Sequence, residues 1–363
     1  MKKRLIIYFS KLSIGGMEMA LINFIKMSNL RKNYDITLYL GYVKEKSYLE
    51  ELQKYVHVIV ICKGEWNTFN KIRTYLKMNI DYLKLKLKKN QYYCSICYTH
   101  HHKILSKLAR AASDNSICFV HTDLLKSRTK EELDKLKKKL RFDRFSKIIC
   151  VSHCAKDAFM KIYPNYKGKV VVANNYINGE FLIEKGKEKV DDYDFAVKTF
   201  INIARHLDYH KHVSYIIEAC NKLRNDYADF KVLLIGDGQD HMLYQNLIDK
   251  YKLNDIVKLL GSRVNPYKYL AKSDAFVFSS QFEGYGIVLD EARVLNVPII
   301  TTDVADAKMI IDEGYGFLCE NSVEGIYRGM KKFLDEGFPK KKFNYHKFNE
   351  KITKTIDEIV VMK

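Results

Sequence analysis

Two carboxylates stand eight positions apart in the stretch SSQFEGYGIVLDEARVLNVPII, residues 279–300. Glu283 precedes Gly284 and Gly286, and Glu291 lies roughly a turn and a half into the helix that the stretch predicts. Glycine lets the backbone approach a ligand closely, and the first N–H groups of a helix favour anions. The spacing predicts that Glu291 binds a diol such as a ribose. Glu283 would then bind a second hydroxylated group beyond the phosphates. An exposed helix residue and an ordinary loop residue would fit the spacing equally well.

Two cations flank a second predicted loop, in FINIARHLDYHKHVSYIIEA, residues 200–219. Arg205 follows a strand pattern and Lys211 precedes a helix pattern, an arrangement that suits a pyrophosphate, although surface charges would fit it too. His121, in CFVHTD, ends another predicted strand. Because ligands bind at the carboxyl ends of parallel strands, we expect His121 to face a cleft between domains, not to be a hydrogen-bonded core histidine.

The elements that must position these residues follow an alternating pattern. Short apolar runs such as RLIIYFS, YDITLYLGY, KVLLIGDG and AFVFSS alternate with segments of helical period. This predicts an α/β protein with two mostly parallel sheets. The acidic interval EKGKEKVDDYDF places the boundary near residues 183–197, so we predict domains at 1–185 and 195–343. The last segment, 344–363, predicts a helix that packs back on the first domain.

The motifs in this order resemble the retaining glycosyltransferases of family 4, which have the GT-B fold. The order is strand, Arg205, loop, Lys211 and helix, then LLIGDGQD, then AKSDAFVFSSQFEGYGIVLDEARVLNVPIITTD. The family's hallmark is Glu, seven residues, Glu, which Glu283 and Glu291 match. SIGGMEMALINF, near the start of the sequence, resembles the family's glycine-rich loop. The resemblance implies two Rossmann-like domains whose parallel sheets face each other across a cleft, with a carboxyl-terminal helix crossing back.

By this resemblance the carboxyl domain binds a nucleotide-sugar donor, most commonly a UDP-sugar. The acceptor hydroxyl attacks the face that the diphosphate leaves, so the anomeric configuration is retained without a metal or another cofactor. The implied catalytic residues are Glu283, His121, Arg205 and Lys211. The implied donor-binding residues are Glu291, Gly284, Tyr285, Gly286, Gly15, Gly16 and Arg263.

The sequence departs from the family pattern beside the arginine. Ala204 and His206 stand where many relatives have glycine and leucine, and GDGQD lacks the full dinucleotide-binding pattern. A nicotinamide cofactor therefore gains no support. The triplet His100, His101 and His102 follows a strand pattern without spaced carboxylates, so it predicts a loop lining instead of a metal site.

Charge is distributed unevenly over a total of +19. Residues 1–190 hold 38 Lys and Arg against 17 Asp and Glu, a net +21, whereas residues 191–363 carry −2. A basic half suits nucleic acid, an anionic membrane or a phosphate-bearing substrate, or is a composition bias alone. No recognition motif for nucleic acid occurs, so we expect no nucleic-acid partner.

Two lysine-rich segments predict amphipathic helices suited to anionic lipid. The alternative is that their apolar stripes pack on the sheet and their lysines are solvated. In the first, the stripe is Ile72, Leu76, Ile80, Leu83 and Leu87, and the cations are Lys71, Lys77, Lys84, Lys86, Lys88 and Lys89. In the second, the stripe is Leu133, Leu136 and Leu140.

The sequence as a whole predicts a retaining glycosyltransferase of surface polysaccharide or capsule biosynthesis. We expect it to transfer a sugar to a hydroxyl of a lipid-linked saccharide, in the cytoplasm and peripherally at the inner face of the cell membrane. No apolar run approaches the ~20 residues of a membrane-spanning helix. A nucleotide-sugar epimerase on the same fold and a basic nucleic-acid-binding protein are the alternatives.

Overall fold

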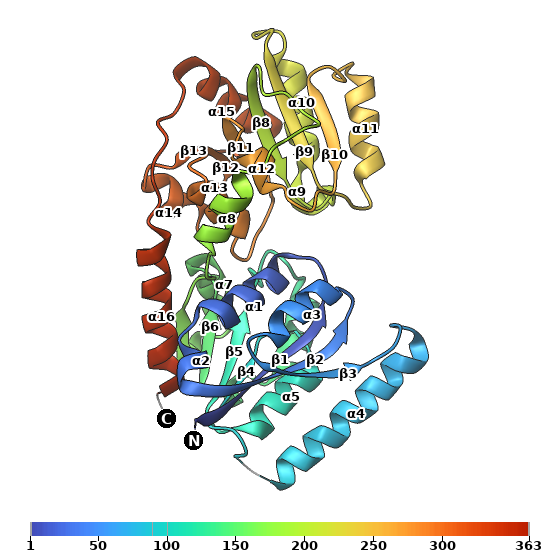
Figure 1. Ribbon diagram of the computed structural model, residues 1–363, viewed down its shortest axis with the longest axis vertical. Coiled ribbons are helices and arrows are strands. Elements are labelled where there is room, and N and C mark those ends of the chain that lie inside the picture. The colour runs from blue at the N-terminus through green and yellow to red at the C-terminus, as the bar shows by residue number, and fades with distance from the viewer. Residues whose placement is uncertain (1, 89, 100, 362–363) are drawn as a thin grey trace. The chain divides into compact units, whose positions relative to one another are not determined.

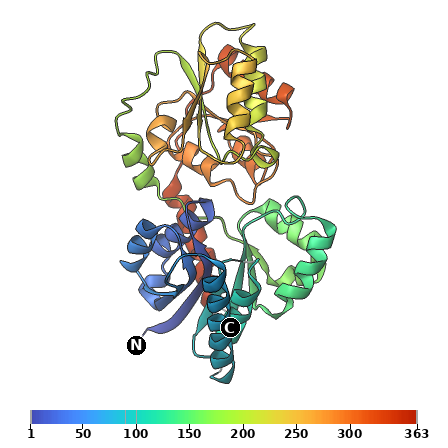
Figure 2. The same ribbon diagram turned by 90° about the vertical axis from the view of Figure 1, so that its right-hand side faces the viewer.

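The computed structural model describes residues 2–88, 90–99 and 101–361, so His100 and Lys89 lie outside the described residues. The chain divides into two compact units (Figures 1 and 2). The first comprises residues 1–177 and 347–363, and the second comprises residues 178–346. Each unit is built on one parallel sheet, which confirms the α/β architecture predicted from the alternating patterns.

A seven-stranded sheet of order β3-β2-β1-β4-β5-β6-β7 forms the centre of the first unit. β1 pairs in parallel with both β2 and β4, so the strand order reverses between β1 and β4. Its central strands are buried on both faces, which explains continuous apolar sequences such as SICFV in β5. The strands are β1 (Lys3–Leu12), β2 (Tyr34–Val43), β3 (His57–Cys62), β4 (Cys94–Cys97), β5 (Ser116–Val120), β6 (Lys147–Cys150) and β7 (Val170–Val172).

Several helices of the first unit begin where a side chain caps their free N–H groups. Thr129 and Glu132 form a reciprocal capping box at the start of α6 (Lys130–Leu140). Ser152 Oγ accepts a hydrogen bond of 3.0 Å from the Ala155 N–H at the start of α7 (His153–Ile162). The other helices are α1 (Gly16–Met27), α2 (Leu30–Asn33), α3 (Lys46–Gln53), α4 (Thr68–Leu87), α5 (Lys103–Ala112), the 3₁₀ turns η1 (Phe142–Arg144) and η2 (Pro164–Lys169), and α16 (Tyr345–Val361).

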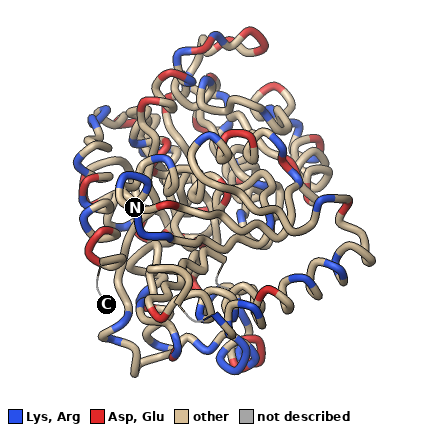
Figure 3. The backbone as a smooth tube through the Cα atoms, turned by 60° about the horizontal axis from the view of Figure 1, so that its bottom comes forward, with Lys and Arg blue, Asp and Glu red and all other residues tan. Residues whose placement is uncertain are grey.

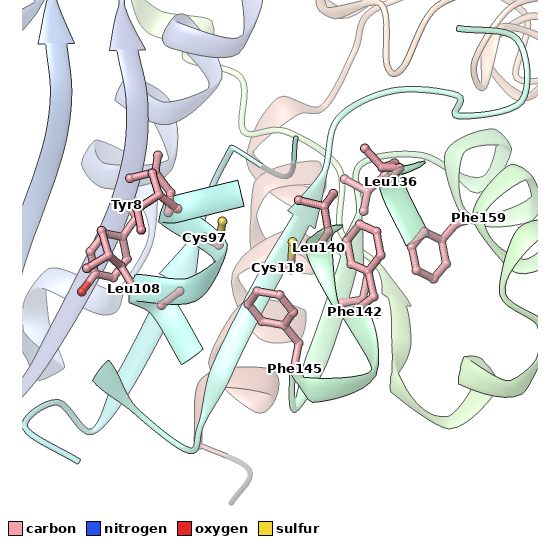
Figure 4. Close-up of a cluster of buried hydrophobic side chains, with 14 of the residues drawn as sticks. Tyr8, Cys97, Leu108, Cys118, Leu136, Leu140, Phe142, Phe145 and Phe159 are labelled. Atoms are coloured by element: carbon pink, nitrogen blue, oxygen red, sulfur yellow. The ribbon is translucent and has the colours of Figure 1, made fainter. Parts of the chain in front are cut away.

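The leucine stripe of α6 belongs to the hydrophobic core (Figure 4). Leu133, Leu136 and Leu140 are at most 9% exposed and lie in one buried cluster with Phe142 and Phe159. Burying each leucine stabilises the unit by about 2 kcal/mol. The prediction that this second stripe lies on a membrane is therefore wrong, because the core of the unit already covers it.

The apolar stripe of α4 remains in solvent. The unit contacts α4 through a different face, where Thr74 and Met78 are buried and the Tyr39 hydroxyl donates a 2.8 Å hydrogen bond to Asp81. Met78 lies two residues from Leu76, about 200° around the helix. The exposed fractions of the stripe residues run from 52% to 86%, for Ile72, Leu76, Ile80, Leu83 and Leu87.

A six-stranded parallel sheet of order β10-β9-β8-β11-β12-β13 forms the second unit. β8 pairs with both β9 and β11, so the strand order reverses between β8 and β11. The strands are β8 (Lys198–Ile203), β9 (Phe230–Ile235), β10 (Val257–Gly261), β11 (Ala275–Phe278), β12 (Ile299–Thr302) and β13 (Gly316–Cys319). The helices are α8 (Gly179–Gly186), α9 (Asp208–Lys211), α10 (Val213–Leu223), α11 (His241–Lys250), α12 (Tyr267–Leu270), α13 (Ile287–Val294), α14 (Ala307–Asp312) and α15 (Val323–Glu336).

The last helix, α16, returns to the first unit as predicted. Its buried face includes Ile352, Ile356 and Ile359. The Asn349 amide donates a 2.8 Å hydrogen bond to the Ile177 carbonyl and accepts one of 3.1 Å from the Ile177 N–H. A buried side chain thus satisfies both backbone groups of the residue at which the chain leaves the first unit.

The observed division of the chain differs from the predicted domain boundary. The first unit ends at Ile177, eight residues before the predicted end at 185, because α8 packs on α12 and α13 of the second unit. A side chain on Gly186 would meet Ala271 and Leu295 at 3.0 Å, so glycine permits this packing. Within the described residues, no helix combines the length and apolarity needed to cross a bilayer.

Candidate functional site

The loops after β8 and β11 lie beside the point where the strand order of the second sheet reverses. Open parallel sheets bind ligands at such a point. The Gln281 N–H donates a 2.8 Å hydrogen bond to the His210 carbonyl, and Ser279 Oγ donates one of 2.8 Å to the Lys211 carbonyl. The two loops are therefore fixed to each other by backbone contacts, as a preorganised site requires.

Lys211 and Glu283 form an ion pair across these loops. Both side chains are mostly buried, at 16% and 13% exposed, and Ser280 Oγ donates a 2.9 Å hydrogen bond to the same Glu283 oxygen. The structure thus brings two predicted catalytic residues into direct contact. The sequence had suggested separate roles for them, on phosphates and on sugar. In this arrangement Glu283 also fixes where the ammonium group lies.

His210 stacks on Phe282 within the same group, with ring centroids 4.2 Å apart. Its Nε2–H donates to the Phe282 carbonyl at 2.8 Å and lies 4.0 Å from the Glu283 carboxylate. Burial lowers the pKa of His210, and the neighbouring charges of Lys211 and Arg205 lower it further, against Glu283. Burial and the cation of Lys211 thus both disfavour the charged imidazole. Sequence reasoning did not single out His210, since one histidine among several in a loop gives no signal.

Arg205 is exposed, and the described residues offer its side chain no ion pair. It lies two residues past β8, so its cation is available for an anion at the edge of the sheet where Lys211 and Glu283 lie. The two predicted cations therefore differ: Lys211 is paired with a carboxylate, whereas Arg205 is exposed to solvent.

The start of α13 combines free backbone donors with a left-handed residue. Gly286 has φ +76°, a conformation that favours glycine, and no side chain caps the helix. Gly284 is buried, and the Tyr285 hydroxyl donates to Asp290 inside the helix. Asp290 is in turn paired at 2.8 Å with Arg293, so a buried network holds the turn. The Tyr285 side chain thus fixes the start of the helix, and the donor-binding role of its backbone stays a prediction.

Glu291 is buried, and the Tyr267 hydroxyl donates a 3.1 Å hydrogen bond to its carboxyl group. Burial raises the pKa of Glu291 to about 7, Tyr267 opposes the shift, and Asp290 adds to it. A carboxyl held this way is unlike an ordinary exposed helix residue, which was the alternative for Glu291. Tyr267, in the segment NPYKYL, is a partner that sequence reasoning missed.

Arg263 follows β10, at the same edge of the sheet, but its guanidinium is engaged by other residues. It pairs with Asp192 at 3.1 Å, and its Nε donates to the Tyr269 hydroxyl at 3.2 Å. Among the described residues, no hydrogen bond or ion pair joins it to Glu283 or Glu291, so its donor-binding role stays a prediction.

The predicted residues of the first unit share one edge of its sheet. Gly15 and Gly16 follow β1 and open α1 without a side-chain cap, and a side chain on Gly16 would meet nothing within 4 Å. His121 follows β5, stacks on Phe119 and packs at a tilt against Tyr98. Burial lowers the pKa of His121 to about 3, so its imidazole is neutral at physiological pH. β4 alone separates β1 from β5, and all three strands run parallel.

Comparison with known proteins gives a family match that lies mostly in the second unit. Residues 192–354 match the family of glycosyl transferases group 1. The N-acetylgalactosamine-N,N'-diacetylbacillosaminyl-diphospho-undecaprenol 4-alpha-N-acetylgalactosaminyltransferase of Campylobacter jejuni is 31% identical over 156 residues, 42% of this chain and 41% of that protein. An uncharacterised glycosyltransferase of Methanocaldococcus jannaschii is 40% identical over 104 residues, 29% and 25% of the two chains. The chain spans less than half the length of these curated relatives.

Solved structures resemble the chain over nearly its whole length. Anabaena HepE in complex with UDP and glucose superposes with a TM-score of 0.77 at 16% identity, covering 98% of this chain and 99% of that one. The lipopolysaccharide outer core galactosyltransferase WaaB, in its apo form, gives a TM-score of 0.68 at 16% identity, with 98% and 99% covered. These likenesses confirm the GT-B fold that the sequence motifs implied.

The raised pKa of Glu291 predicts a dependence of stability on pH. In the unfolded chain the carboxyl loses its proton near pH 4.5, whereas in the folded protein it keeps it up to about pH 7. As the pH rises between these values, the free energy of unfolding of the parent falls, because the folded protein disfavours the ionised carboxyl. Glutamine does not ionise, so Glu291→Gln should not show this loss. We expect the difference in the free energy of unfolding, variant minus parent, to be about 2 kcal/mol larger at pH 8 than at pH 5. Urea unfolding at each pH measures this difference.

Glu336→Gln, at an exposed glutamate of α15, is the matched control and should show no such change. A Glu291→Gln effect of equal size at both pH values would contradict the assignment of a raised pKa.

Proposed function

Because residues 192–354 belong to the family of glycosyl transferases group 1, we propose that this protein is a retaining glycosyltransferase that uses a nucleotide-sugar donor. The observation that carries the proposal is the joined pair of loops after β8 and β11. They bring Arg205, the Lys211–Glu283 pair and the uncapped start of α13 to one edge of the second sheet. An anionic, hydroxylated ligand is the chemistry that this combination recognises.

The donor's parts correspond to distinct features of this edge. Arg205 and the free N–H groups at the start of α13 bind the diphosphate, which carries the negative charge. The Glu291 carboxyl accepts hydrogen bonds from the ribose diol. Those hydroxyls stabilise the ionised form of a carboxyl that burial disfavours, so nucleotide binding lowers the pKa of Glu291. Glu283 accepts hydrogen bonds from the donor sugar while it positions Lys211.

The transfer step replaces one bond to the anomeric carbon by another. The bond to the diphosphate oxygen breaks, the acceptor oxygen attacks from the same face, and the acceptor's hydroxyl proton passes to the departing diphosphate. Negative charge grows on the leaving group, so cations that are already in place stabilise the transition state. Lys211 and Arg205 supply that charge, and the step requires no metal.

His121 is the proposed acceptor-side residue of the first unit. Its neutral imidazole can donate a hydrogen bond from one nitrogen and accept one at the other. The packing against Tyr98 and Phe119 restricts the orientation of the ring. A hydrogen bond from such a ring suits a sugar hydroxyl better than a charged group would.

The names of similar proteins support a uridine nucleotide and a lipid-linked acceptor. HepE is described in complexes with UDP and glucose and with UDP-glucose. The similar Campylobacter enzyme is named for an acceptor on diphospho-undecaprenol, and WaaB for the lipopolysaccharide outer core. We therefore propose a UDP-sugar donor, a lipid-linked saccharide acceptor and a place in surface polysaccharide assembly on the cytoplasmic side of the membrane. An epimerase would bind the same donor but would need no acceptor.

A nucleotide titration tests the donor site. We expect one of UDP, GDP and ADP to bind without added metal, UDP before the others. Arg205→Ala should weaken that binding at least tenfold, because it removes the cation that the described residues leave for the diphosphate. Isothermal titration calorimetry of parent and variant measures both affinities.

Arg328→Ala, on the exposed face of α15, is the matched arginine control and should bind like the parent. Binding of no nucleotide, or equal binding by Arg205→Ala, would exclude the proposed donor site. Acceptor-independent interconversion of the donor sugar would favour the epimerase.

Glu283→Ala separates catalysis from nucleotide binding. The carboxylate faces the sugar and Lys211, so we expect turnover with the intact donor to fall about a hundredfold while affinity for free nucleotide stays within about threefold. Initial rates of sugar transfer and calorimetry with the nucleotide give the two quantities.

Glu324→Ala is the control, since it removes the carboxylate of an exposed surface pair with Lys222. Unchanged turnover of Glu283→Ala would remove Glu283 from the mechanism.

The exposed stripe of α4 supports contact with an anionic membrane. Leu76, Leu83 and Leu87 are 59%, 57% and 86% exposed, and such a row of large apolar groups is uncommon on a soluble face. Figure 3 shows the Lys and Arg positions that recur along this helix, at the lower right. The described lysines of α4 and its end are Lys71, Lys77, Lys84, Lys86 and Lys88.

The geometry of α4 suits a helix that lies in the plane of a lipid surface. Its packed face is opposite the apolar stripe, and its one acidic residue, Asp81, is occupied by Tyr39. Each lysine near an anionic surface contributes about 1 kcal/mol, while the leucines and isoleucines enter the headgroup region.

Leu76→Ser combined with Leu83→Ser tests the membrane contact. We expect the parent to sediment with vesicles of phosphatidylglycerol and phosphatidylcholine, and the double variant to bind at least tenfold more weakly, because apolar burial is lost. Salt should weaken binding by the parent.

Met242→Ser combined with Leu243→Ser is the control, since these side chains of α11 are 64% and 43% exposed but lie in the other unit. Equal sedimentation of the α4 variant and the parent would contradict a role for this helix.

A further inference from the structure

A cluster of three potential metal ligands lies next to the loop that carries Arg205 and Lys211. His206 is three residues past β8, Asp237 is two residues past β9, and His241 is the first residue of α11. The two histidine Nδ1 atoms are 3.0 Å apart, and His241 Nδ1 is 3.7 Å from an Asp237 carboxylate oxygen. All three ligand atoms lie within 4.8 Å of one another.

The backbone fixes this cluster through the alignment of β8 and β9. Ile203 is the register partner of Ile235, the His206 N–H donates a 3.0 Å hydrogen bond to the Asp237 carbonyl, and the Asp240 N–H donates to the His206 carbonyl at 3.2 Å. The close approach depends on glycine, because a side chain on Gly238 would lie 2.3 Å from the His206 carbonyl oxygen. The GDGQD motif therefore serves this contact between loops.

The two facing imidazoles are close enough to share either one proton or one cation. Two Nδ1 atoms at 3.0 Å cannot both carry a proton, so they share one hydrogen bond or ligate one cation. His206 is 1% exposed and stacks with His241 at 5.0 Å between ring centroids, while Tyr244 packs edge-on against it.

Two imidazole nitrogens and one carboxylate oxygen are a zinc ligand set. Ligand atoms around a tetrahedral Zn²⁺ with bonds of about 2.0–2.1 Å are separated by about 3.3 Å, between the 3.0 Å and 3.7 Å that separate His241 Nδ1 from the other two ligand atoms. Mg²⁺ and Ca²⁺ prefer oxygen ligands and would leave the imidazoles unused. The Asp237 side chain is 67% exposed, so it has room to turn toward the ion and a water can complete the fourth position.

We propose that His206, Asp237 and His241 bind a zinc ion that joins the loop after β8 to the loop after β9. The site is separate from the Lys211–Glu283 pair, and the ion takes no part in sugar transfer. It stabilises residues 204–212, the segment from which Arg205 and Lys211 project. The site does not depend on the proposed function, since it rests on the ligand geometry alone.

Zinc titration of chelator-treated, reduced full-length protein tests the site. We expect the parent to bind one more Zn²⁺ than His241→Ala or Asp237→Asn, or to bind it at least tenfold more tightly, in competition with a chromophoric zinc indicator. Zinc should raise the melting temperature of the parent by several degrees and that of the variants by less. Co²⁺ in place of zinc should give a tetrahedral visible spectrum without a thiolate charge-transfer band, because no cysteine belongs to the site.

His57→Ala and Asp229→Asn are the matched controls, because both residues are exposed and lie outside the cluster. They should bind zinc like the parent. Equal zinc binding and equal melting shifts in parent and cluster variants would overturn the proposal and leave a hydrogen bond between the imidazoles. A thiolate band with Co²⁺ that persists in His241→Ala would assign the ion to cysteines and would overturn it too. Circular dichroism of each variant establishes that it is folded.

Discussion

The parallel pairing of β8 with both β9 and β11 is the constraint on which the second unit depends. It places the ends of three strands at one edge, and the loops that leave them then contact one another. On one side of β8 the contact produces the Lys211–Glu283 pair, and on the other it produces the His206–His241 pair. A shift of one residue in the pairing would reverse which side chains face the core, so the same register that buries the strands also assembles both groups.

Much of this arrangement follows from local sequence. Apolar runs define the strands, glycines mark the start of α13, and the strand-end positions of Arg205, Lys211, Glu283 and His121 predict one sheet edge in each unit. The partners of these residues could not be predicted. Tyr267 lies 24 positions from Glu291 and Lys211 lies 72 positions from Glu283, and such contacts are set by tertiary packing that no local pattern encodes.

The two lysine-rich helices also show that local sequence does not determine tertiary contacts. α4 and α6 carry similar stripes of leucine and isoleucine flanked by lysine, so sequence patterns treat them alike. They differ because the leucines of α6 are buried in the hydrophobic core, whereas α4 is held through Thr74, Met78 and the Tyr39–Asp81 hydrogen bond. Tertiary packing, and not the stripe itself, decides which face of each helix is buried. The position of α8 followed a similar rule, since its contacts with α12 and α13 assign it to the second unit.

The return of α16 to the first unit has a consequence for biosynthesis. The ribosome delivers residues 1–177 first, but the helix whose Asn349 satisfies the backbone of Ile177 emerges only after the whole second unit has been made. Until then the hydrophobic surface that Ile352, Ile356 and Ile359 cover is uncovered in the nascent chain. The second unit is continuous in sequence and can fold while the chain is still attached. The first unit, although translated earlier, is therefore the last to be completed.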